Sequence, residues 1–285
     1  MRVLILGATG MLGNAAFKVL SGDPEWEVYG TLRSAFAIKH FPEAIRSRLV
    51  SGIDVLDRDV MARLLGKIRP EAVINCTGII KQLESANDPL AILPLNAMFP
   101  HQLADLCALS GARLISLSSD CVYSGRKGNY AESDPSDAED LYGKSKNIGE
   151  VPGHRHVVTL RTSGIGHELN SNNGLLEWFL SQEGRVKGYA KAIYSGIPSV
   201  ELARTIKNHV LPRPDLHGLY HVSAKPISKF DLLTLIAEVY GKKIEIERDD
   251  AVAVDRSLDS RRFTQATGYV APEWPALVAL MHAQQ

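Results

Sequence analysis

Two side chains in the middle of the chain, Tyr142 and Lys146, have the types and the spacing needed for proton transfer. On a helix, residues four apart project from the same face, so the two groups lie close together. An ammonium group stabilises a phenolate and moves the pKa of a phenol down from about 10 toward neutrality. The pattern Tyr-x-x-x-Lys is also common on solvated helix faces, so its position in the fold has to support this interpretation.

The position of this pair is informative. One strand and loop earlier, the run Leu-Ser-Ser-Asp-Cys-Val-Tyr ending at Tyr123 places Ser119 at the carboxyl end of a predicted strand. In sheets of alternating strands and helices, reacting groups and ligands lie outside the carboxyl ends of the strands. We therefore predict that Ser119, Tyr142 and Lys146 form a catalytic set.

The N-terminus has the pattern of a dinucleotide-binding turn. An apolar strand from residue 2 enters glycines at 7, 10 and 13, and an amphipathic helix follows. Such glycines let the turn close tightly and bring helix N-terminal N–H groups onto a pyrophosphate. The alternative is an ordinary tight turn between a strand and a helix. The residues that we expect to bind the cofactor here are Gly7, Thr9, Gly10, Met11, Leu12 and Gly13.

The chain continues as alternating strands and helices. This order predicts an α/β protein with a doubly wound parallel (Rossmann) sheet. We assign residues 1–163 to this nucleotide-binding domain and 164–285 to a smaller mixed α/β region that binds the substrate, with segments that can be interleaved. Further predicted strands are 27–32, 48–50, 72–75, 112–117, 156–160 and 219–222, and predicted helices are 57–68, 96–110, 138–150 with Asp137 as its cap, 174–182, 199–210, 227–240 and one after Pro272.

The end of the second strand indicates which dinucleotide binds. An acidic residue there accepts a bond from the ribose 2′-OH of NAD, whereas a 2′-phosphate favours arginine. This chain has Arg33, with the hydroxyls of Thr31 and Ser34 beside it. The planar guanidinium suits a phosphate, so we predict NADP(H). The alternative is that Arg33 is an ordinary solvated residue.

Composition excludes several classes of protein. The 32 Lys and Arg balance 32 Asp and Glu, so no net charge draws the chain to nucleic acid or to an anionic membrane. Three widely spaced cysteines have no zinc-ligand spacing and indicate reduced thiols without a disulfide or a metal site. The short N-terminal apolar run is neither a signal peptide nor a membrane span. We expect a soluble cytoplasmic protein.

The motifs around these residues resemble a known family. The glycine spacing and the Ser, Tyr and Lys set resemble the extended short-chain dehydrogenase/reductases. The runs Ser-Ser-Asp-Cys-Val-Tyr-Ser-Gly ending at Gly125, Tyr-Gly-Lys-Ser-Lys and Leu-Arg-Thr-Ser, together with Asn96, resemble the dTDP-4-dehydrorhamnose reductase family. The match is specific up to about residue 165 and thin beyond it.

The resemblance implies a function and roles for individual residues. The family reduces a 4-keto group on a nucleotide-linked 6-deoxy sugar with NADPH, in surface polysaccharide or deoxysugar biosynthesis. It implies that Ser119 orients the carbonyl, that Tyr142 exchanges its proton, and that Lys146 tunes Tyr142 and holds the nicotinamide ribose. Further residues that it places at the cofactor are Asp54 and Val55 near the adenine and Cys76, Thr77 and Gly78 after the fourth strand.

The chain also departs from the family pattern at two positions. Rhamnose-forming reductases have Tyr at Cys121 and Trp at Gly164, so the sugar can differ from the rhamnose precursor. The Asp-Glu pair of sugar dehydratases is missing after Ser119, which disfavours dehydration. The Ser-x-Cys spacing resembles GDP-fucose synthase, in which a cysteine and a histidine epimerise carbons beside the ketone. Epimerisation by Cys121 with His167 is therefore an alternative function, and an inert small residue at 121 is another.

The substrate needs cations for its diphosphate. Arg256 and Arg261, in a segment resembling the family's sugar-nucleotide site, suit bidentate binding of a diphosphate, and Lys81 suits a position facing the sugar. Each can equally be a solvated surface residue. The sequence does not indicate whether the nucleotide is dTDP, UDP or GDP.

An alternative of another class is a regulatory subunit that binds NADP(H) without turnover, as methionine adenosyltransferase β-subunits resemble this family. The extended family also implies a homodimer.

Overall fold

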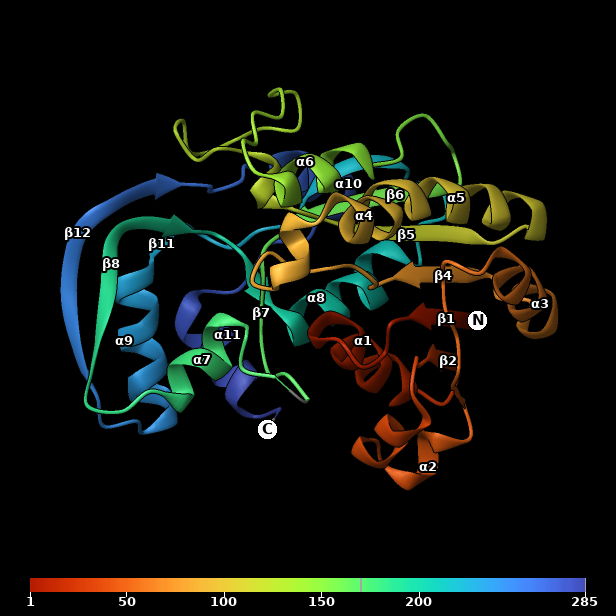
Figure 1. The fold of residues 1–285 in the computed structure, drawn as a ribbon, viewed down its shortest axis with the longest axis horizontal. Helices are drawn as coiled ribbons and strands as arrows, with labels where there is room; N and C mark the ends of the chain where they lie inside the picture. The colour runs from red at the N-terminus through yellow and green to blue at the C-terminus, as the bar shows by residue number, and fades with distance from the viewer. Residues whose placement is uncertain (170, 285) are drawn as a thin grey trace.

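The computed structural model describes residues 1–169 and 171–284 and is built around a seven-stranded parallel sheet (Figure 1). The strand order is β10-β6-β5-β4-β1-β2-β3, and every neighbouring pair runs parallel. Helices cover both faces, so the predicted doubly wound fold is confirmed. The seven strands are β1 (Arg2–Leu6), β2 (Glu27–Thr31), β3 (Leu49–Val50), β4 (Ala72–Asn75), β5 (Arg113–Ser119), β6 (Val157–Thr162) and β10 (Gly218–His221).

The longer helices lie close to the predicted positions, whereas the short helices at 43–46, 89–92 and 261–267 were not predicted. The long predicted helices at 96–110 and 199–210 each contain a π-helical stretch, η3 (Leu93–Met98) and η5 (Ile206–Val210). The α-helices are α1 (Met11–Ser21), α2 (Glu43–Arg46), α3 (Arg58–Ile68), α4 (Pro89–Ile92), α5 (Phe99–Ser110), α6 (Leu141–Ile148), α7 (Leu175–Ser181), α8 (Ser199–Thr205), α9 (Lys229–Tyr240), α10 (Arg261–Thr267) and α11 (Trp274–His282). The 3₁₀ helices are η1 (Ala35–His40), η2 (Glu84–Asn87) and η4 (Asp120–Val122).

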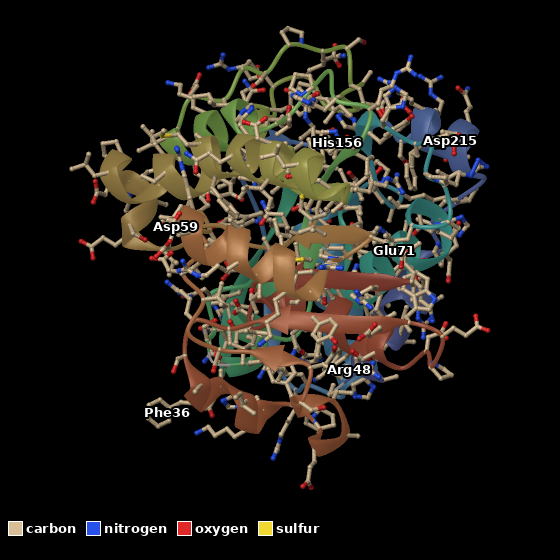
Figure 2. All side chains as sticks on the ribbon, turned by 90° about the vertical axis from the view of Figure 1, so that its right-hand side faces the viewer. Phe36, Arg48, Asp59, Glu71, His156 and Asp215 are labelled. Atoms are coloured by element: carbon tan, nitrogen blue, oxygen red, sulfur yellow. The ribbon has the colours of Figure 1, made fainter. Side chains whose placement is uncertain are left out.

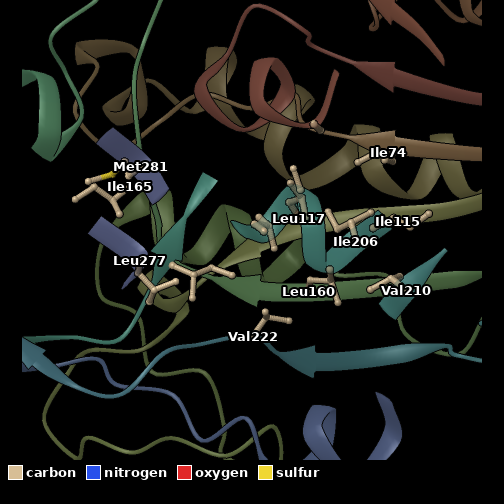
Figure 3. Packing of buried hydrophobic residues seen from close by; sticks show 14 of the residues in the cluster. Ile74, Ile115, Leu117, Leu160, Ile165, Ile206, Val210, Val222, Leu277 and Met281 are labelled. Carbon is tan, nitrogen blue, oxygen red and sulfur yellow. The ribbon is translucent and has the colours of Figure 1, made fainter. Parts of the chain in front are cut away.

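The central strands are apolar throughout because both faces of the sheet are buried. In β1, Val3 and Ile5 face one hydrophobic cluster, whereas Leu4 and Leu6 face another that contains α3 and α5. The first cluster joins strand residues such as Ile115 to helices of the second half of the chain, as Figure 3 shows for Ile206, Val210 and Leu277. The second half of the chain therefore shares its core with the central sheet.

One strand of the central sheet comes from the second half of the chain. The predicted segment 219–222 corresponds to β10, which pairs with β6 along Val158–Arg161 and forms the edge of the sheet. The segments of the two regions are therefore interleaved. Local pattern indicates a strand at this position, but its partner lies some 60 residues earlier and only tertiary packing selects it.

The smaller region contains a sheet that the sequence analysis missed. Strand β8 (Arg185–Tyr194) pairs with the short antiparallel β11 (Ile227–Ser228) and with the long parallel β12 (Glu245–Asp255). These two long strands carry alternating charges that pair across them, as in the contact of Lys187 with Asp249. A polar, half-exposed strand has little apolar periodicity, which explains the omission. Two further short strands, β7 (Gly164–Ile165) and β9 (Ile197–Pro198), pair with each other.

The surface is charged, as the composition indicates. Asp59, Glu71 and Asp215 lie on the periphery, and Phe36 in η1 points away from the protein with 88% of its surface exposed (Figure 2). Among the described residues, no helix combines the length and the apolar character of a membrane span. The three cysteines Cys76, Cys107 and Cys121 are free thiols.

Candidate active site

The glycine turn closes tightly at the carboxyl end of β1. Gly7 has a φ of +79°, a left-handed conformation that favours glycine, and its N–H donates to Thr31 Oγ1 at 3.0 Å. A Cβ on Gly13 would lie 2.1 Å from the Gly7 carbonyl oxygen, so only glycine lets α1 start this close to the turn. Gly10 is the N-cap of α1. The helix N-terminus that begins at Met11 and Leu12 therefore opens beside Thr9 toward the ligand edge of the sheet.

Thr31 has a different role from the predicted one. We expected its hydroxyl beside Arg33 at a 2′-phosphate, but it is buried and supports the glycine turn. Ser34 accepts a bond from the Phe36 N–H and caps η1. Arg33 itself is exposed just after β2, and Asp54 is exposed in the loop after the adjacent β3, beside the half-buried Val55. Arg33 is thus an exposed cation at this edge.

The loop after β4 is held against the glycine turn. Asn75 Oδ1 accepts bonds from both the N–H and the hydroxyl of Thr77, and Thr77 Cγ2 would lie 3.1 Å from a Cβ on Gly7. Asn96 in η3 binds both the N–H and the carbonyl of Ile79, at 2.8 and 2.9 Å. Cys76, Thr77 and Gly78 therefore form a fixed wall next to the glycines.

Ser119 is the last residue of β5 and is 8% exposed. Its Oγ accepts a bond from the Cys121 N–H at 3.1 Å and forms a hydrogen bond of 3.1 Å with Asp120 Oδ1. These contacts fix the hydroxyl at the carboxyl edge of the sheet, where the sequence analysis placed it.

Tyr142 and Lys146 lie on α6, which packs on the loop after β5. A Cβ on Gly143 would lie 2.2 Å from the Cys121 carbonyl oxygen, so the glycine permits this close approach. The Lys146 ammonium donates to the carbonyl of Leu117 at 2.7 Å. Strand β5 and helix α6 thereby bring Ser119 and the predicted pair to one place.

The cap of α6 differs from the prediction. Asp140, rather than Asp137, accepts a bond from the Gly143 N–H at 2.7 Å, and Asp137 instead accepts bonds from the N–H and hydroxyl of Ser124. Lys81 pairs with Asp140 at 2.5 Å. Lys81, predicted near the sugar, therefore also steadies the start of the catalytic helix.

Burial changes the pKa values of the pair. Burial raises the pKa of Tyr142 above its ordinary value, a shift that Cys121 and Asp120 reinforce and Ser119 opposes. Burial also lowers the pKa of Lys146 to about 8, although Glu150 favours its charged form. The sequence analysis expected Lys146 to lower the pKa of Tyr142, and desolvation reverses that shift. At neutral pH Tyr142 therefore holds its proton and can donate it.

The predicted Cys121 and His167 pair does not form. Burial, reinforced by Asp120, raises the pKa of Cys121 to about 12. His167 instead contacts Glu177 at 2.7 Å and the Tyr240 hydroxyl at 3.0 Å, in the wall of a separate cavity of about 330 Å³. A thiol in this state is a poor base for carbon epimerisation.

Gly164 is likewise explained by packing. A Cβ there would lie 2.8 Å from Leu12 Cδ2 and 3.1 Å from Met11 Cε. Both atoms are ends of flexible side chains, so a larger residue at this position would require Leu12 and Met11 to change their side-chain positions.

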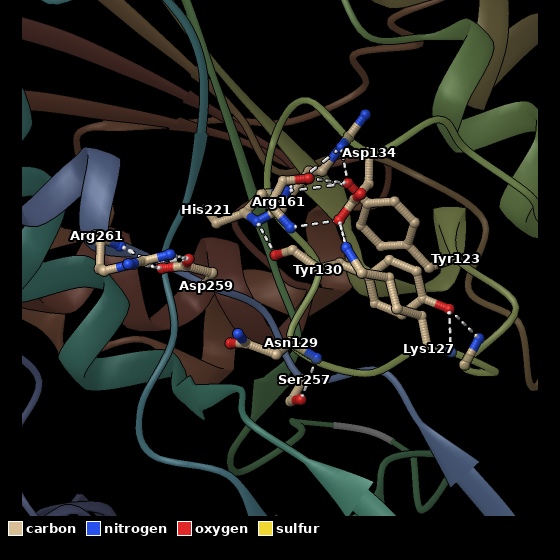
Figure 4. Close-up of polar contacts among 12 residues, drawn as sticks. Tyr123, Lys127, Asn129, Tyr130, Asp134, Arg161, His221, Ser257, Asp259 and Arg261 are labelled. Carbon is tan, nitrogen blue, oxygen red and sulfur yellow. Dashed lines mark hydrogen bonds and ion pairs between the residues drawn. The ribbon is translucent and has the colours of Figure 1, made fainter.

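The two predicted arginines occupy different environments. Arg256 Nε donates to the Tyr123 carbonyl at 2.8 Å, and Arg256 acts electrostatically on Asp120 and Cys121. Arg261 is bound to Asp259, as Figure 4 shows. Its side chain is 82% exposed and lines another cavity of about 370 Å³. Only Arg256 belongs to the cluster around Ser119.

The sequence analysis missed Lys229, the first residue of α9. Burial lowers its pKa, and Asp120 and Cys121 oppose this shift, whereas Arg256 and Lys81 reinforce it. These mutual effects place Lys229 among the charged groups near Ser119. No local pattern marks it, because a lysine opening a helix is ordinary.

A buried polar network supports the site from behind. Arg161 makes two bonds of 2.6 Å to the Glu150 carboxylate and one of 2.5 Å to the Tyr123 hydroxyl. Ser118 also donates to Glu150 at 2.7 Å, and His221 lies 3.4 Å from Tyr123 (Figure 4). Burial and Arg161 lower the pKa of His221 to about 4, so it stays neutral. The network ties β5, β6 and β10 to the end of α6.

This fold and this set of Ser119, Tyr142 and Lys146 define a protein of the extended short-chain dehydrogenase/reductase class. The chain belongs to the RmlD substrate binding domain family, whose pattern it matches over residues 1–283. The predicted family is thereby confirmed. The Ser-x-Cys likeness to GDP-fucose synthase stays a prediction.

Characterised relatives are of two kinds. Methionine adenosyltransferase 2 subunit beta of Danio rerio is 26% identical over 255 residues, 84% of this chain and 74% of that protein. A dTDP-4-dehydrorhamnose reductase of Streptomyces griseus is 29% identical over 150 residues, 52% of this chain and 43% of that protein. The second match thus spans less than half of the reductase.

Solved structures match along almost the whole chain. A hypothetical dTDP-4-dehydrorhamnose reductase from Sulfolobus tokodaii is 26% identical with a TM-score of 0.79, covering 96% of this chain and 98% of that one. The dTDP-4-dehydrorhamnose reductase of Bacillus anthracis in complex with NADP is 20% identical with a TM-score of 0.80, covering 100% and 99%. The latter likeness shows the fold alone.

The state of the thiols can be tested directly. Burial raises the pKa of Cys76, Cys107 and Cys121 to about 12 in each case. Alkylation requires the thiolate, so we expect iodoacetamide at pH 8 to label the native protein at least about 100-fold more slowly than the urea-unfolded protein. Mass spectrometry of tryptic peptides measures the labelling of each cysteine. Fast labelling of Cys121 alone would contradict this and would favour the epimerase alternative.

Proposed function

We propose that this protein is an NADPH-dependent reductase of a 4-keto group on a nucleotide-linked 6-deoxy sugar. The observation that carries the proposal is the convergence of Ser119, Tyr142 and Lys146 at the carboxyl edge of the sheet. Family membership over residues 1–283 supports the same reaction class. The predicted homodimer and cytoplasmic location stay predictions.

The residues present fit a dinucleotide. The close contact at Gly13 and the left-handed Gly7 hold the start of α1 against the turn, and the 76–78 loop lines the adjoining wall. NADPH supplies a hydride when it is bound. We assign Lys146 to the nicotinamide ribose and the guanidinium of Arg33 to a 2′-phosphate.

Ser119 and Tyr142 then have different roles in the reduction of the carbonyl group. Ser119 donates a hydrogen bond to the carbonyl oxygen and holds it near the Tyr142 hydroxyl. As the carbon accepts the hydride, Tyr142 gives its proton to the developing alkoxide, and the product is an alcohol. The raised pKa of Tyr142 keeps this proton available at neutral pH.

For the substrate we assign Arg256 and Lys81, which lie around Cys121 and carry positive charge. Arg256 uses only Nε for the Tyr123 carbonyl, so its terminal nitrogens suit a diphosphate oxygen. We no longer assign Arg261 and His167 to the substrate, because Asp259 binds the former and Glu177 and Tyr240 bind the latter.

A second candidate function is that of a regulatory subunit that binds NADP(H) without turnover. The likeness to methionine adenosyltransferase 2 subunit beta over 84% of this chain supports it. The complete Ser119, Tyr142 and Lys146 set favours the reductase.

The proposal is tested with NADPH and a panel of dTDP-, UDP- and GDP-4-keto-6-deoxy sugars, with nicotinamide absorbance as the readout. We expect one of these sugars to be reduced and Tyr142→Phe to lower kcat by at least about 100-fold, because the proton donor is lost. Tyr29→Phe, on β2, serves as the control. If the protein binds NADPH tightly but reduces none of the sugars, the regulatory function replaces the reductase.

Cofactor choice depends on Arg33. We expect Arg33→Ala to weaken NADPH binding by about 10- to 100-fold and NADH binding by less than about threefold, because only NADPH carries the 2′-phosphate. Fluorescence titration with both nucleotides measures this, and Lys39→Ala on the exposed η1 is the control for loss of a nearby charge. Equal losses for the two nucleotides would refute the assignment.

Cofactor binding should also depend on the charge of Lys146. Its lowered pKa means that the ammonium is lost as pH rises through about 8. We expect NADPH affinity to fall by about tenfold across that range, since charge-assisted hydrogen bonds to the ribose are lost. In Lys146→Arg the charge persists, so the dependence should move above pH 9 or vanish. An unchanged pH profile in this variant would exclude Lys146 as its cause.

A further inference from the structure

Asp120 is a buried carboxyl group that has no role in the reaction proposed above. It follows Ser119 directly, opens η4 and is 6% exposed. Its Oδ1 lies 3.1 Å from Ser119 Oγ. A buried carboxyl group at a reacting edge has a structural or chemical reason to be there.

The hydrogen bonds of Ser119 limit what its hydroxyl can do. A serine hydroxyl has one proton to donate and two lone pairs to accept. The Cys121 N–H occupies one lone pair at 3.1 Å. If Asp120 is a carboxylate, it can only accept hydrogen bonds, so the Ser119 hydroxyl donates its single proton to Asp120. Ser119 would then have no proton for a substrate carbonyl.

Burial and the neighbouring groups act on the pKa of Asp120 in opposite directions. Burial raises its pKa, and this outweighs the opposing charge of Arg256 and the hydrogen bonds of Ser119, Cys121 and Ser163. Lys229 from α9 is the other cation that acts on it. The remaining titratable neighbours are Tyr142 of α6, Tyr194 of β8 and Cys121, whose raised pKa values keep them neutral.

We propose that Asp120 is the positioning residue of this site: as a neutral acid it donates to Ser119 Oγ and turns the Ser119 hydroxyl toward the substrate carbonyl. The arrangement satisfies all three hydrogen bonds of Ser119, two accepted from Asp120 and the Cys121 N–H and one donated to the substrate. Asp120 keeps its proton throughout, because the carbon takes the hydride and the oxygen takes the proton of Tyr142. The inference rests on the proposed function for its effect on turnover.

A double-mutant cycle with an infrared measurement tests the proposal. We expect Asp120→Ala to lower kcat by about tenfold or more, because the Ser119 hydroxyl loses its fixed orientation. In a Ser119→Ala background the same change should cost less than about twofold, since Asp120 acts through Ser119. Asp120→Asn, whose amide still donates, should recover most of the loss. Glu139→Gln, on the exposed surface, is the control for removal of an acid.

The infrared measurement uses the whole protein at pH 7 without substrate. The difference spectrum between wild type and Asp120→Asn should contain the C=O stretch of a protonated carboxylic acid, and Glu139→Gln should not change it. Absence of that band, or a cost of Asp120→Ala that persists without the Ser119 hydroxyl, would overturn the proposal. If wild type reduces no sugar in the panel, the proposed function fails, and the band alone decides whether Asp120 carries the proton.

Discussion

The contact between Gly143 and the Cys121 carbonyl is the constraint on which the catalytic geometry depends. Any side chain at Gly143 would place a Cβ 2.2 Å from that oxygen and push α6 away from the loop after β5. Ser119 lies on one side of this contact and Tyr142 on the other. Their separation is therefore set by backbone packing, which is stiffer than contacts between long side chains. The Lys146 bond to the Leu117 carbonyl holds the same pair of elements one turn later.

The cofactor half of the site is connected to this contact through η3. A Cβ on Gly149, after the end of α6, would lie 2.0 Å from the carbonyl oxygen of Asn96, so the two segments touch directly. The Asn96 side chain holds the loop after β4, and that loop lies against Gly7 of the glycine turn. A continuous set of close contacts thus runs from α6, which carries Tyr142, to the glycine turn. A displacement of α6 would reach both halves of the site.

The sequence alone predicted those features of the fold and the site that depend on residues close together in the chain. The glycines at 7, 10 and 13 and the spacing of Tyr142 and Lys146 need only neighbouring residues to be recognised, and the parallel fold follows from the strand and helix order. Contacts between distant segments were not accessible. Thr31 reaches Gly7 across 24 residues, and Arg256 reaches Tyr123 across 133. The pKa values also escaped prediction, because desolvation of Tyr142 depends on the whole surrounding fold.

The central claim, that hydride delivered at the glycine turn reaches a sugar ketone held at Ser119 and Tyr142, is tested most directly by isotope transfer. The protein is incubated with NADPH deuterated at the nicotinamide C4 and with the reducible sugar nucleotide, and the product is analysed by NMR. The account predicts one deuterium at the sugar carbon that carried the ketone, with none at the adjacent carbons. Deuterium that is lost to solvent, or a product without label, would contradict it.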